Sequence, residues 1–356
     1  MNNKNHAAAC VLSLCLVGWI GQMSFAHTAT SRDVADTLEQ KAVISVQTSR
    51  VALNTAASAG ERLVVAGVRG TILYSDDQGQ HWKQANVPVS VSLTSLCFND
   101  KAVGWAVGHR GVILKTVDGG QNWVRQLDGF RAAQAILQQY HDDPEHVDDA
   151  RRLVDEGADK PFLAVQCMGA GRALAVGAYG LAFATGDGEH WTPALSVLAG
   201  SDSHHLNAVQ LLGGQVYLAG ELGGLMRIDA DLQHFTRLDE PYDGSFFGLL
   251  ATPSNTLLAL GLRGHLFRSD DRGSSWHAVA LATSKSLTAA TLLSDGSVLL
   301  ADESGAGWLS RDDGRSFRQV SPEQRFPLVA LLATRDGGSL AVGIQGITRF
   351  SPGALR

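Results

Sequence analysis

The chain has 356 residues, of which 39 are glycine and only 18% are charged, with a formal net charge of −6. Removal of a leader that contains Lys4 would leave 28 (29 less 1) basic against 35 acidic residues, a net charge of −7. This mild acidity argues against a nucleic-acid partner. Abundant glycine and short apolar runs between turn residues are typical of an all-β protein.

The first segment, residues 1–26, has the pattern of a secretory signal peptide. Lys4 precedes an apolar stretch from Ala7 to Gly21, and Ser24 to Ala26 places small residues where a signal peptidase cleaves. An uncleaved membrane anchor is the alternative, but the apolar stretch is about fifteen residues long and a spanning helix needs about 20. We therefore expect a periplasmic mature chain of residues 27–356.

Seven copies of one repeat follow, and most successive copies are about 41 residues apart. Each copy has a short apolar run that ends in two glycines three residues apart, which indicates two strands and the turn between them. The first position of each pair is Gly67, Gly108, Gly177, Gly220, Gly261, Asp302 (in place of glycine) and Gly343. The second glycines are Gly70, Gly111, Gly180, Gly223, Gly264, Gly305 and Gly346.

Five copies continue into an Asp-box, in which an aspartate follows a hydroxyl residue by two positions and an aromatic residue comes next. A carboxylate in this place accepts hydrogen bonds from its own turn, and a large aromatic side chain packs on the neighbouring sheet. We therefore predict structural rather than catalytic roles. The aspartates are Asp77, Asp118, Asp187, Asp271 and Asp312, and the aromatic residues are Trp82, Trp123, Trp191, Trp276 and Phe317.

About forty residues for each copy of four strands is the size of a propeller blade, so the sequence predicts one seven-bladed β-propeller domain. The seventh copy ends at Phe350, a few residues before the C-terminus, and lacks room for an outermost strand. The run from Ala42 to Gln47 belongs to no complete blade. We predict that this run pairs with the seventh blade and closes the ring.

A helical insertion at residues 131–160 lengthens the step between the second and third copies. Arg131 to His141 has helical spacing of apolar residues, Asp143 and Pro144 are start signals for a second helix, and Gly157 is its expected end. The insertion either only packs on the ring or is a docking element.

Cleavage of the leader leaves two cysteines, Cys97 and Cys167, on the predicted innermost strands of adjacent blades. In an oxidising compartment they could pair, but their apolar neighbours favour two free, buried thiols. No spacing typical of a metal site occurs, so we expect neither a metal nor a cofactor.

Three copies carry an arginine immediately before the second glycine, at Arg69, Arg110 and Arg263. Equivalent turns of a propeller lie on one face, where these guanidinium groups could meet carboxylates or phosphates of a partner. The alternative is that each arginine is a solvated turn residue or pairs with an acid of its own blade.

Several segments together resemble the YCF48-related, or photosystem II stability and assembly factor-like, propellers of heterotrophic proteobacteria. The resemblance implies a non-enzymatic, monomeric, exported scaffold that binds a membrane protein complex through an arginine-rich face, with an RND-type exporter as the suggested partner. The insertion and the non-arginine turns depart from the pattern. The segments are Gly60–Trp82, Val87–Thr94, Gly104–Gly108, Asp118–Gly120 and Asp159–Leu163.

An enzyme is the rival class, because Asp-box propellers include sialidases. Sialidases usually carry an F/Y-R-I-P segment near the N-terminus, whereas here Arg325, Phe326 and Pro327 stand late in the chain and in the wrong order. We therefore expect no catalytic residue. Binding of a small ligand in the axial channel is a third possibility.

Overall fold

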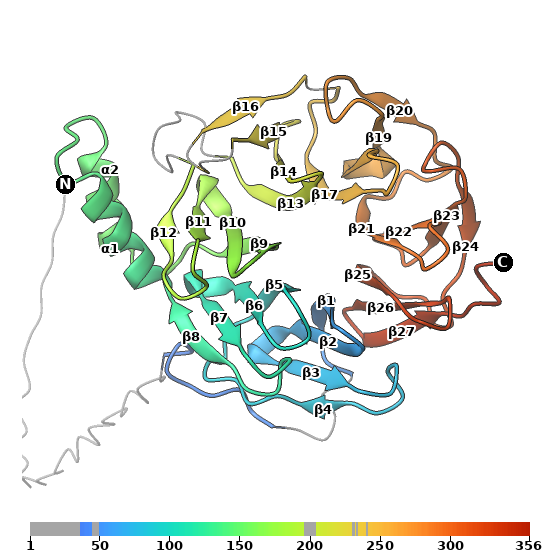
Figure 1. The fold of residues 1–356 in the computed structure, drawn as a ribbon, viewed down its shortest axis with the longest axis horizontal. Helices are drawn as coiled ribbons and strands as arrows, with labels where there is room; N and C mark the ends of the chain where they lie inside the picture. Colours follow the sequence, from blue (N-terminus) through green and yellow to red (C-terminus); the bar gives the residue numbers. More distant parts are fainter. Residues whose placement is uncertain (1–35, 45–49, 196–203, 230–231, 233, 240) are drawn as a thin grey trace, which may run out of the picture. The chain divides into compact units, whose positions relative to one another are not determined.

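The computed structural model describes residues 36–356 except 45–49, 196–203, 230–231, 233 and 240. The described residues form seven antiparallel sheets arranged in a ring (Figure 1). Strands β1, β5, β9, β13, β17, β21 and β25 lie nearest the centre, and each sheet runs outward in sequence order. The predicted seven-bladed β-propeller is confirmed.

Among the described strands, six blades have four each and the seventh has three, as predicted. The first three blades are β1 Leu53–Ala59, β2 Arg62–Gly67, β3 Ile72–Ser75, β4 Lys83–Gln84; β5 Leu93–Phe98, β6 Gly104–Gly108, β7 Ile113–Thr116, β8 Val124–Leu127; and β9 Phe162–Gly169, β10 Arg172–Gly177, β11 Ala182–Thr185, β12 Thr192–Pro193. The fourth and fifth are β13 Leu206–Leu212, β14 Gln215–Gly220, β15 Leu225–Ile228, β16 Phe235–Arg237; and β17 Phe246–Ala251, β18 Leu257–Gly261, β19 Leu266–Ser269, β20 His277–Val279. The last two are β21 Leu287–Leu292, β22 Val298–Asp302, β23 Gly307–Ser310, β24 Arg318–Val320; and β25 Leu328–Ala333, β26 Ser339–Gly343, β27 Gly346–Phe350.

The second strand of a blade is covered on both faces by the neighbouring blades, which is why it is an unbroken apolar run. Every residue of β6, β18, β22 and β26 is buried. The hydrophobic clusters lie between successive blades: Leu53 and Val65 of the first blade, for example, pack with Leu340 and Val342 of the seventh. Stability in such a ring comes mainly from contacts between nearest neighbours.

The turns between third and fourth strands close on themselves. In the first blade the hydroxyl of Ser75 donates to Asp77 Oδ1 at 2.8 Å and accepts the N–H of Gly79 at 2.8 Å. Asp77 Oδ1 also accepts the N–H of His81 at 2.9 Å, and this bond and the His81 ring hold the pKa of the Asp77 carboxyl well below its usual range. The same hydroxyl-to-carboxylate bond occurs at Asp118, Asp187, Asp271 and Asp312. These contacts are what a structural role requires.

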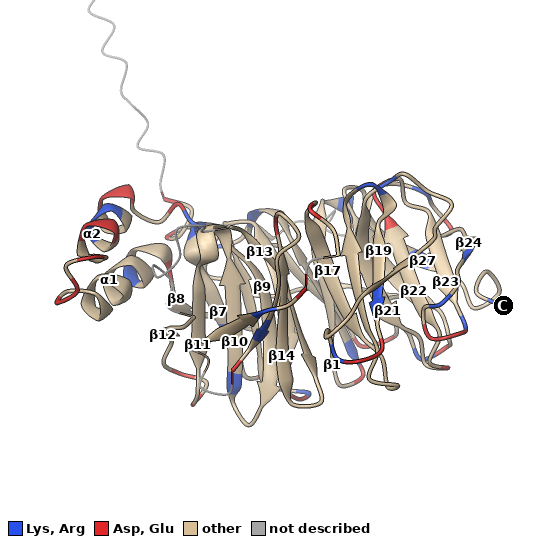
Figure 2. Cartoon of the chain, turned by 90° about the horizontal axis from the view of Figure 1, so that it is seen from above, with Lys and Arg blue, Asp and Glu red and all other residues tan. Residues whose placement is uncertain are grey.

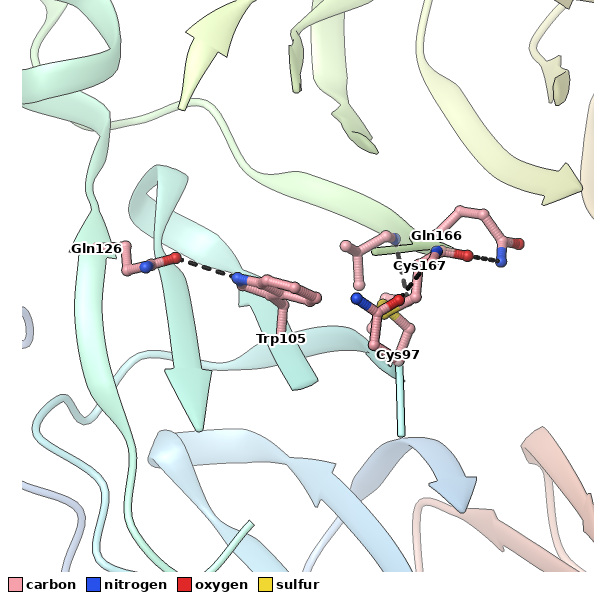
Figure 3. Close-up of a disulfide and its surroundings, with 9 residues drawn as sticks. Cys97, Trp105, Gln126, Gln166 and Cys167 are labelled. Atoms are coloured by element: carbon pink, nitrogen blue, oxygen red, sulfur yellow. Dashed lines mark hydrogen bonds between the residues drawn. A yellow bond between two sulfur atoms is a disulfide. The ribbon is translucent and has the colours of Figure 1, made fainter. Parts of the chain in front are cut away.

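The tryptophan side chains of these turns donate hydrogen bonds to different acceptors in different blades. The indole N–H groups of Trp82 and Trp123 each donate to a glycine carbonyl of their own turn, at 3.1 and 3.0 Å. Trp191 instead donates to Gln126 Oε1 at 2.9 Å. Trp105 donates to the same oxygen at 3.1 Å, as Figure 3 shows. A single amide of the second blade therefore binds a tryptophan of its own blade and one of the third.

The insertion is a helical hairpin of α1 Gly129–Gln139 and α2 Val147–Glu156. The first helix begins two residues earlier than predicted, because Asp128 is its N-cap and accepts the N–H of Arg131 at 3.1 Å. The second begins three residues after Pro144, which precedes the helix, and ends at Gly157 (φ 74°) as predicted. Ala132, Ile136 and Ala150 are buried in the core between the second and third blades.

The prediction of two free, buried thiols is wrong: Cys97 on β5 and Cys167 on β9 form a disulfide and are only partly buried (Figure 3). Their Cα atoms are 5.7 Å apart, a separation that a disulfide spans. The apolar neighbours of each cysteine indicated burial but carried no information on the distance between two inner strands.

The prediction for Ala42 to Gln47 is also wrong for its described part, and residues 45–47 lie outside the described residues. The N–H of Ala42 donates to Val87 O at 3.1 Å, and the carbonyl of Val43 accepts from Gln84 Nε2 at 2.9 Å. This segment therefore lies on the first blade and its connection to the second, where Val87 is buried in an apolar core with which Ala42 packs. Side-chain packing between β26 and the first blade joins the two ends of the ring.

Candidate interaction face

Two sets of connections share one face of the ring. Second and third strands are joined by short turns, four of them 3-10 helices (η2 Val68–Gly70, η3 His109–Gly111, η4 Ala178–Gly180 and η5 Leu262–Gly264). Because strands alternate in direction, the connections from one blade to the next lie at the same ends. The N–H of Gly70 donates to Val91 O at 2.6 Å, and that of Gly223 to Gly244 O at 2.8 Å, each across to such a connection. We call this surface the turn face.

Charged residues gather at the ends of the strands on both sides of the ring (Figure 2). The turn face includes the helical hairpin, because the hairpin is the connection between the second and third blades. The turns with Asp77 and its equivalents lie at the opposite ends of the third strands, on the other face.

The residue before the second glycine has a left-handed backbone in five of the seven blades. The φ values are 54° for Arg69, 60° for Arg110, 55° for Tyr179, 51° for Leu222 and 57° for Arg263. Left-handed backbone costs a residue other than glycine about 1–2 kcal/mol. Five of the seven turns therefore carry a large side chain on a strained backbone.

Of the three predicted arginines, Arg110 forms an ion pair and an aromatic contact with other residues of the chain. Its Nη2 lies 2.8 Å from Asp36 Oδ2, and its guanidinium carbon is 5.6 Å from the centre of the Phe130 ring. Both partners come from outside its own blade, one from the segment before the ring and one from α1. Arg110 therefore anchors these two segments to the turn face.

Arg69 and Arg263 are exposed, and neither side chain forms an ion pair with any other described residue. A guanidinium group matches carboxylate and phosphate groups with two parallel hydrogen bonds. The turn face thus carries Arg69 in the first blade and Arg263 in the fifth, neither paired with a described acid, and the anchored Arg110 in the second.

The third and fourth blades present apolar side chains at the corresponding positions. Tyr179 is 55% exposed and Leu222 is 60% exposed. The Tyr179 ring lies 4.8 Å from the ring of His205, and Glu221 Oε2 accepts the backbone N–H of His205 at 3.0 Å. Glu221 is therefore occupied locally and does not neutralise a distant arginine.

A further arginine on this face, Arg325, was missed by the sequence analysis as a binding residue. Its Nη2 donates to Ser304 Oγ at 2.8 Å and its Nε to Ser304 O at 3.2 Å, at the sixth-blade position equivalent to Arg69. Arg325 belongs to a connection between blades and not to the repeated turn, so alignment of the repeats does not reveal it.

No group of three or more His, Cys, Asp or Glu residues in the described ranges is arranged to hold a metal ion. Among the helices that the structure describes, none is long and apolar enough to cross a membrane.

The fold and the turn face define the class as a seven-bladed β-propeller that presents side chains from strained turns on one face. The family model for the photosynthesis system II assembly factor YCF48 matches residues 17–117 and 80–139. Over this part of its length the chain is similar to the YCF48-related propellers. Comparison with the curated proteins gives no match.

Similar solved structures agree on the fold. "YCF48 bound to D1 peptide" has a TM-score of 0.63 at 17% identity, covering 85% of this chain and 94% of that one. YCF48 from Cyanidioschyzon merolae has a TM-score of 0.63 at 15% identity, with coverage of 88% and 99%. A streptogramin B lyase has a TM-score of 0.67 at 10% identity, with coverage of 87% and 96%. Because one of these is named as an enzyme, the fold alone does not decide whether this chain has an activity.

Proposed function

We propose that the protein is a non-enzymatic, exported assembly factor that binds a membrane protein complex through the turn face. The observation that carries the proposal is the exposure of Arg69 and Arg263 on strained turns of one face, where neither forms an ion pair with a described residue. A relative in the same fold is described as bound to a peptide of D1, which supports a polypeptide as the ligand.

The partner in this proposal is an RND-type exporter, with acidic groups on the surface that meets the turn face. Free guanidinium groups on the rim of an interface increase the rate of association with an acidic partner and contribute to its recognition. The proposed compartment is the periplasm. The disulfide between Cys97 and Cys167 supports it, because disulfides persist in oxidising compartments.

The experiment compares tagged wild-type protein with the double variant Arg69→Ala/Arg263→Ala, cross-linked in intact cells and purified from solubilised membranes. Arg272→Ala is the matched control, since Arg272 is exposed and left-handed (φ 58°) in the same blade as Arg263 but lies on the opposite face. We expect wild type and control to enrich an RND-type exporter, and the double variant to lose at least about tenfold of that enrichment.

Equal recovery by all three proteins would refute the role of the turn face. Recovery of the propeller alone would refute the membrane partner. Hydrolysis of a fluorogenic sialoside by the purified wild type would refute the non-enzymatic assignment.

A further inference from the structure

Among the described residues, the outer edge of the seventh blade is not covered by a further strand. In the six other blades the third strand pairs with a fourth strand of two to four residues. In the seventh, β27 pairs with β26 on one side, and no described strand pairs with its other side. An uncovered strand edge is a template for pairing with another extended chain.

The backbone groups at this edge can be assigned from one hydrogen bond. Arg349 O accepts the N–H of Glu323 at 2.8 Å, so this carbonyl points away from β26. Backbone direction alternates along an antiparallel strand, and therefore the N–H and C=O of Ile347 and the N–H of Arg349 also point outward. None of these three groups has a hydrogen-bond partner among the described residues.

A groove of about 670 Å³ follows this edge, within the range of about 300–1,000 Å³ that binding pockets occupy. Arg50, Gly79 and Trp82 of the first blade form one wall. The other wall consists of β27 residues with Glu323 and Gln324, and the end at the turn face consists of Ile344 and Gln345. The groove thus lies where a fourth strand would lie.

We infer that this groove binds an extended segment of a partner polypeptide, which adds to β27 as the missing fourth strand of the seventh blade. The backbone groups of Ile347 and Arg349 would supply main-chain hydrogen bonds, the mode by which sheet edges bind peptides. Trp82 and the 55%-exposed Ile344 provide apolar contacts. Arg50 is exposed and forms no ion pair with a described residue, so the segment combines apolar side chains with a carboxylate.

The shape of the groove favours one incoming strand over a second copy of the ring. The first blade and the connection with Glu323 border the edge on both sides. In a second copy β27 is bordered by the same two walls, so direct pairing of two β27 edges would bring four walls together, whereas a single extended segment meets only two. The described segment before the ring binds instead to Val87 and Gln84.

The inference is independent of the proposed role of the turn face, because it uses different residues and a different kind of contact. Gln345 is the seventh-blade equivalent of Arg69, and the groove therefore opens at the turn face. A partner bound on that face could insert a segment of its chain into the groove.

The test uses a fluorescein-labelled five-residue peptide of alternating valine and polar residues with one central aspartate. Binding to the full mature protein is followed by fluorescence anisotropy, and the exchange rates of the Ile347 and Arg349 amides are measured with and without peptide. A peptide with lysine in place of the aspartate is the matched probe. Ile347→Pro removes one outward N–H, and Arg50→Glu reverses the charge in the groove. Lys285→Glu reverses an exposed charge elsewhere and is the control variant.

We expect saturating peptide to slow exchange of both amides at least about tenfold, and Ile347→Pro to weaken binding about tenfold, the effect of one good hydrogen bond. Arg50→Glu should weaken the aspartate peptide and strengthen the lysine peptide, while Lys285→Glu changes neither. If Ile347→Pro does not fold, the amide exchange rates and the comparison of the two peptides with Arg50→Glu still test whether the peptide binds along β27.

Three results would overturn the inference. Unchanged exchange rates at saturating peptide would place binding elsewhere. Strong protection of the Ile347 amide in the free, dilute protein would show that the chain's own residues already cover the edge. Protection that rises with protein concentration, together with a dimer in sedimentation, would assign the edge to a second copy.

Discussion

The hydroxyl of Thr94 on β5 donates to the carbonyl oxygen of Phe162 on β9 at 2.8 Å, and so joins the innermost strands of two successive blades. The same position is used at three other steps around the ring. Asn54 donates to Leu93 O, Asn207 to Phe246 O and Thr288 to Leu328 O, at 2.8, 2.9 and 2.6 Å. Short polar side chains at these sites therefore link neighbouring blades around the channel.

Replacing Thr94 by valine keeps the shape of the side chain and removes this donor. We expect Thr94→Val to lower the free energy of unfolding by about 1 kcal/mol, the usual net effect of one partly buried hydrogen bond. Urea denaturation measures the change. Thr236→Val on the exposed strand β16 is the control and should stay within about 0.5 kcal/mol of wild type. Equal effects of the two substitutions would contradict the link.

The disulfide joins the same two strands and should contribute more. Removing it in Cys97→Ala/Cys167→Ala is expected to lower the free energy of unfolding by about 2–4 kcal/mol, because the bond closes a loop across a sequence separation of 70. A reducing agent should lower the melting temperature of wild type and leave the double variant unaffected. Titration of two free thiols in the native protein would show that the bond does not form.

Gln126 holds two tryptophans through one oxygen, and its substitution should therefore be costly. In Gln126→Leu the indole N–H groups of Trp105 and Trp191 lose their common acceptor. A buried donor without a partner costs about 1–3 kcal/mol. Calorimetric unfolding measures the loss. Gln319→Leu, on the exposed part of fourth strand β24, should leave stability within about 0.5 kcal/mol of wild type.

Substitution of the turn-face arginines should distinguish a residue that stabilises the fold from residues that bind a partner. Arg110→Ala removes the ion pair with Asp36 and the contact with Phe130, and we expect a loss of about 0.5–1 kcal/mol in stability. Arg69→Ala and Arg263→Ala remove no ion pair with a described residue, so we expect them to leave stability unchanged while reducing partner capture. A stability loss at Arg69 equal to that at Arg110 would show that Arg69 also has an internal role.

Acid should weaken the turns between third and fourth strands. The hydroxyl and N–H of Ser275 lower the pKa of Asp271 to about 2 from an ordinary 3.8. A carboxyl with a lowered pKa in the folded state stabilises the fold fully above its ordinary pKa and loses that contribution as the pH falls toward the folded value. The melting temperature should therefore fall between pH 4 and 2, and Asp271→Asn should reduce that slope. The control Asp155→Asn, at an exposed position of α2, should leave the slope of melting temperature against pH unchanged.

The repeat made most of the fold predictable, because glycine pairs and hydroxyl–aspartate turns are local signals that recur in register. The three-stranded seventh blade followed from counting residues to Phe350. The disulfide and the course of the segment at Ala42 did not follow, since both depend on contacts between residues far apart in sequence. The same limit applies to the turn face: its positions were predictable, but the contact of Arg110 with Asp36 and the place of Arg325 depend on connections outside the repeat.

Among the described residues, the first blade consists of β1–β4 and the seventh of β25–β27, and neither of these sheets includes a strand from the other end of the chain. In this arrangement the hydrogen-bonded strands of each blade come from one continuous stretch of sequence. During synthesis from the N-terminus, the chain can therefore complete its sheets one after another, because no described sheet needs strands from both ends of the chain. The final step is the docking of the seventh blade against the first, which makes that seam the place where assembly of the ring ends and where its opening begins.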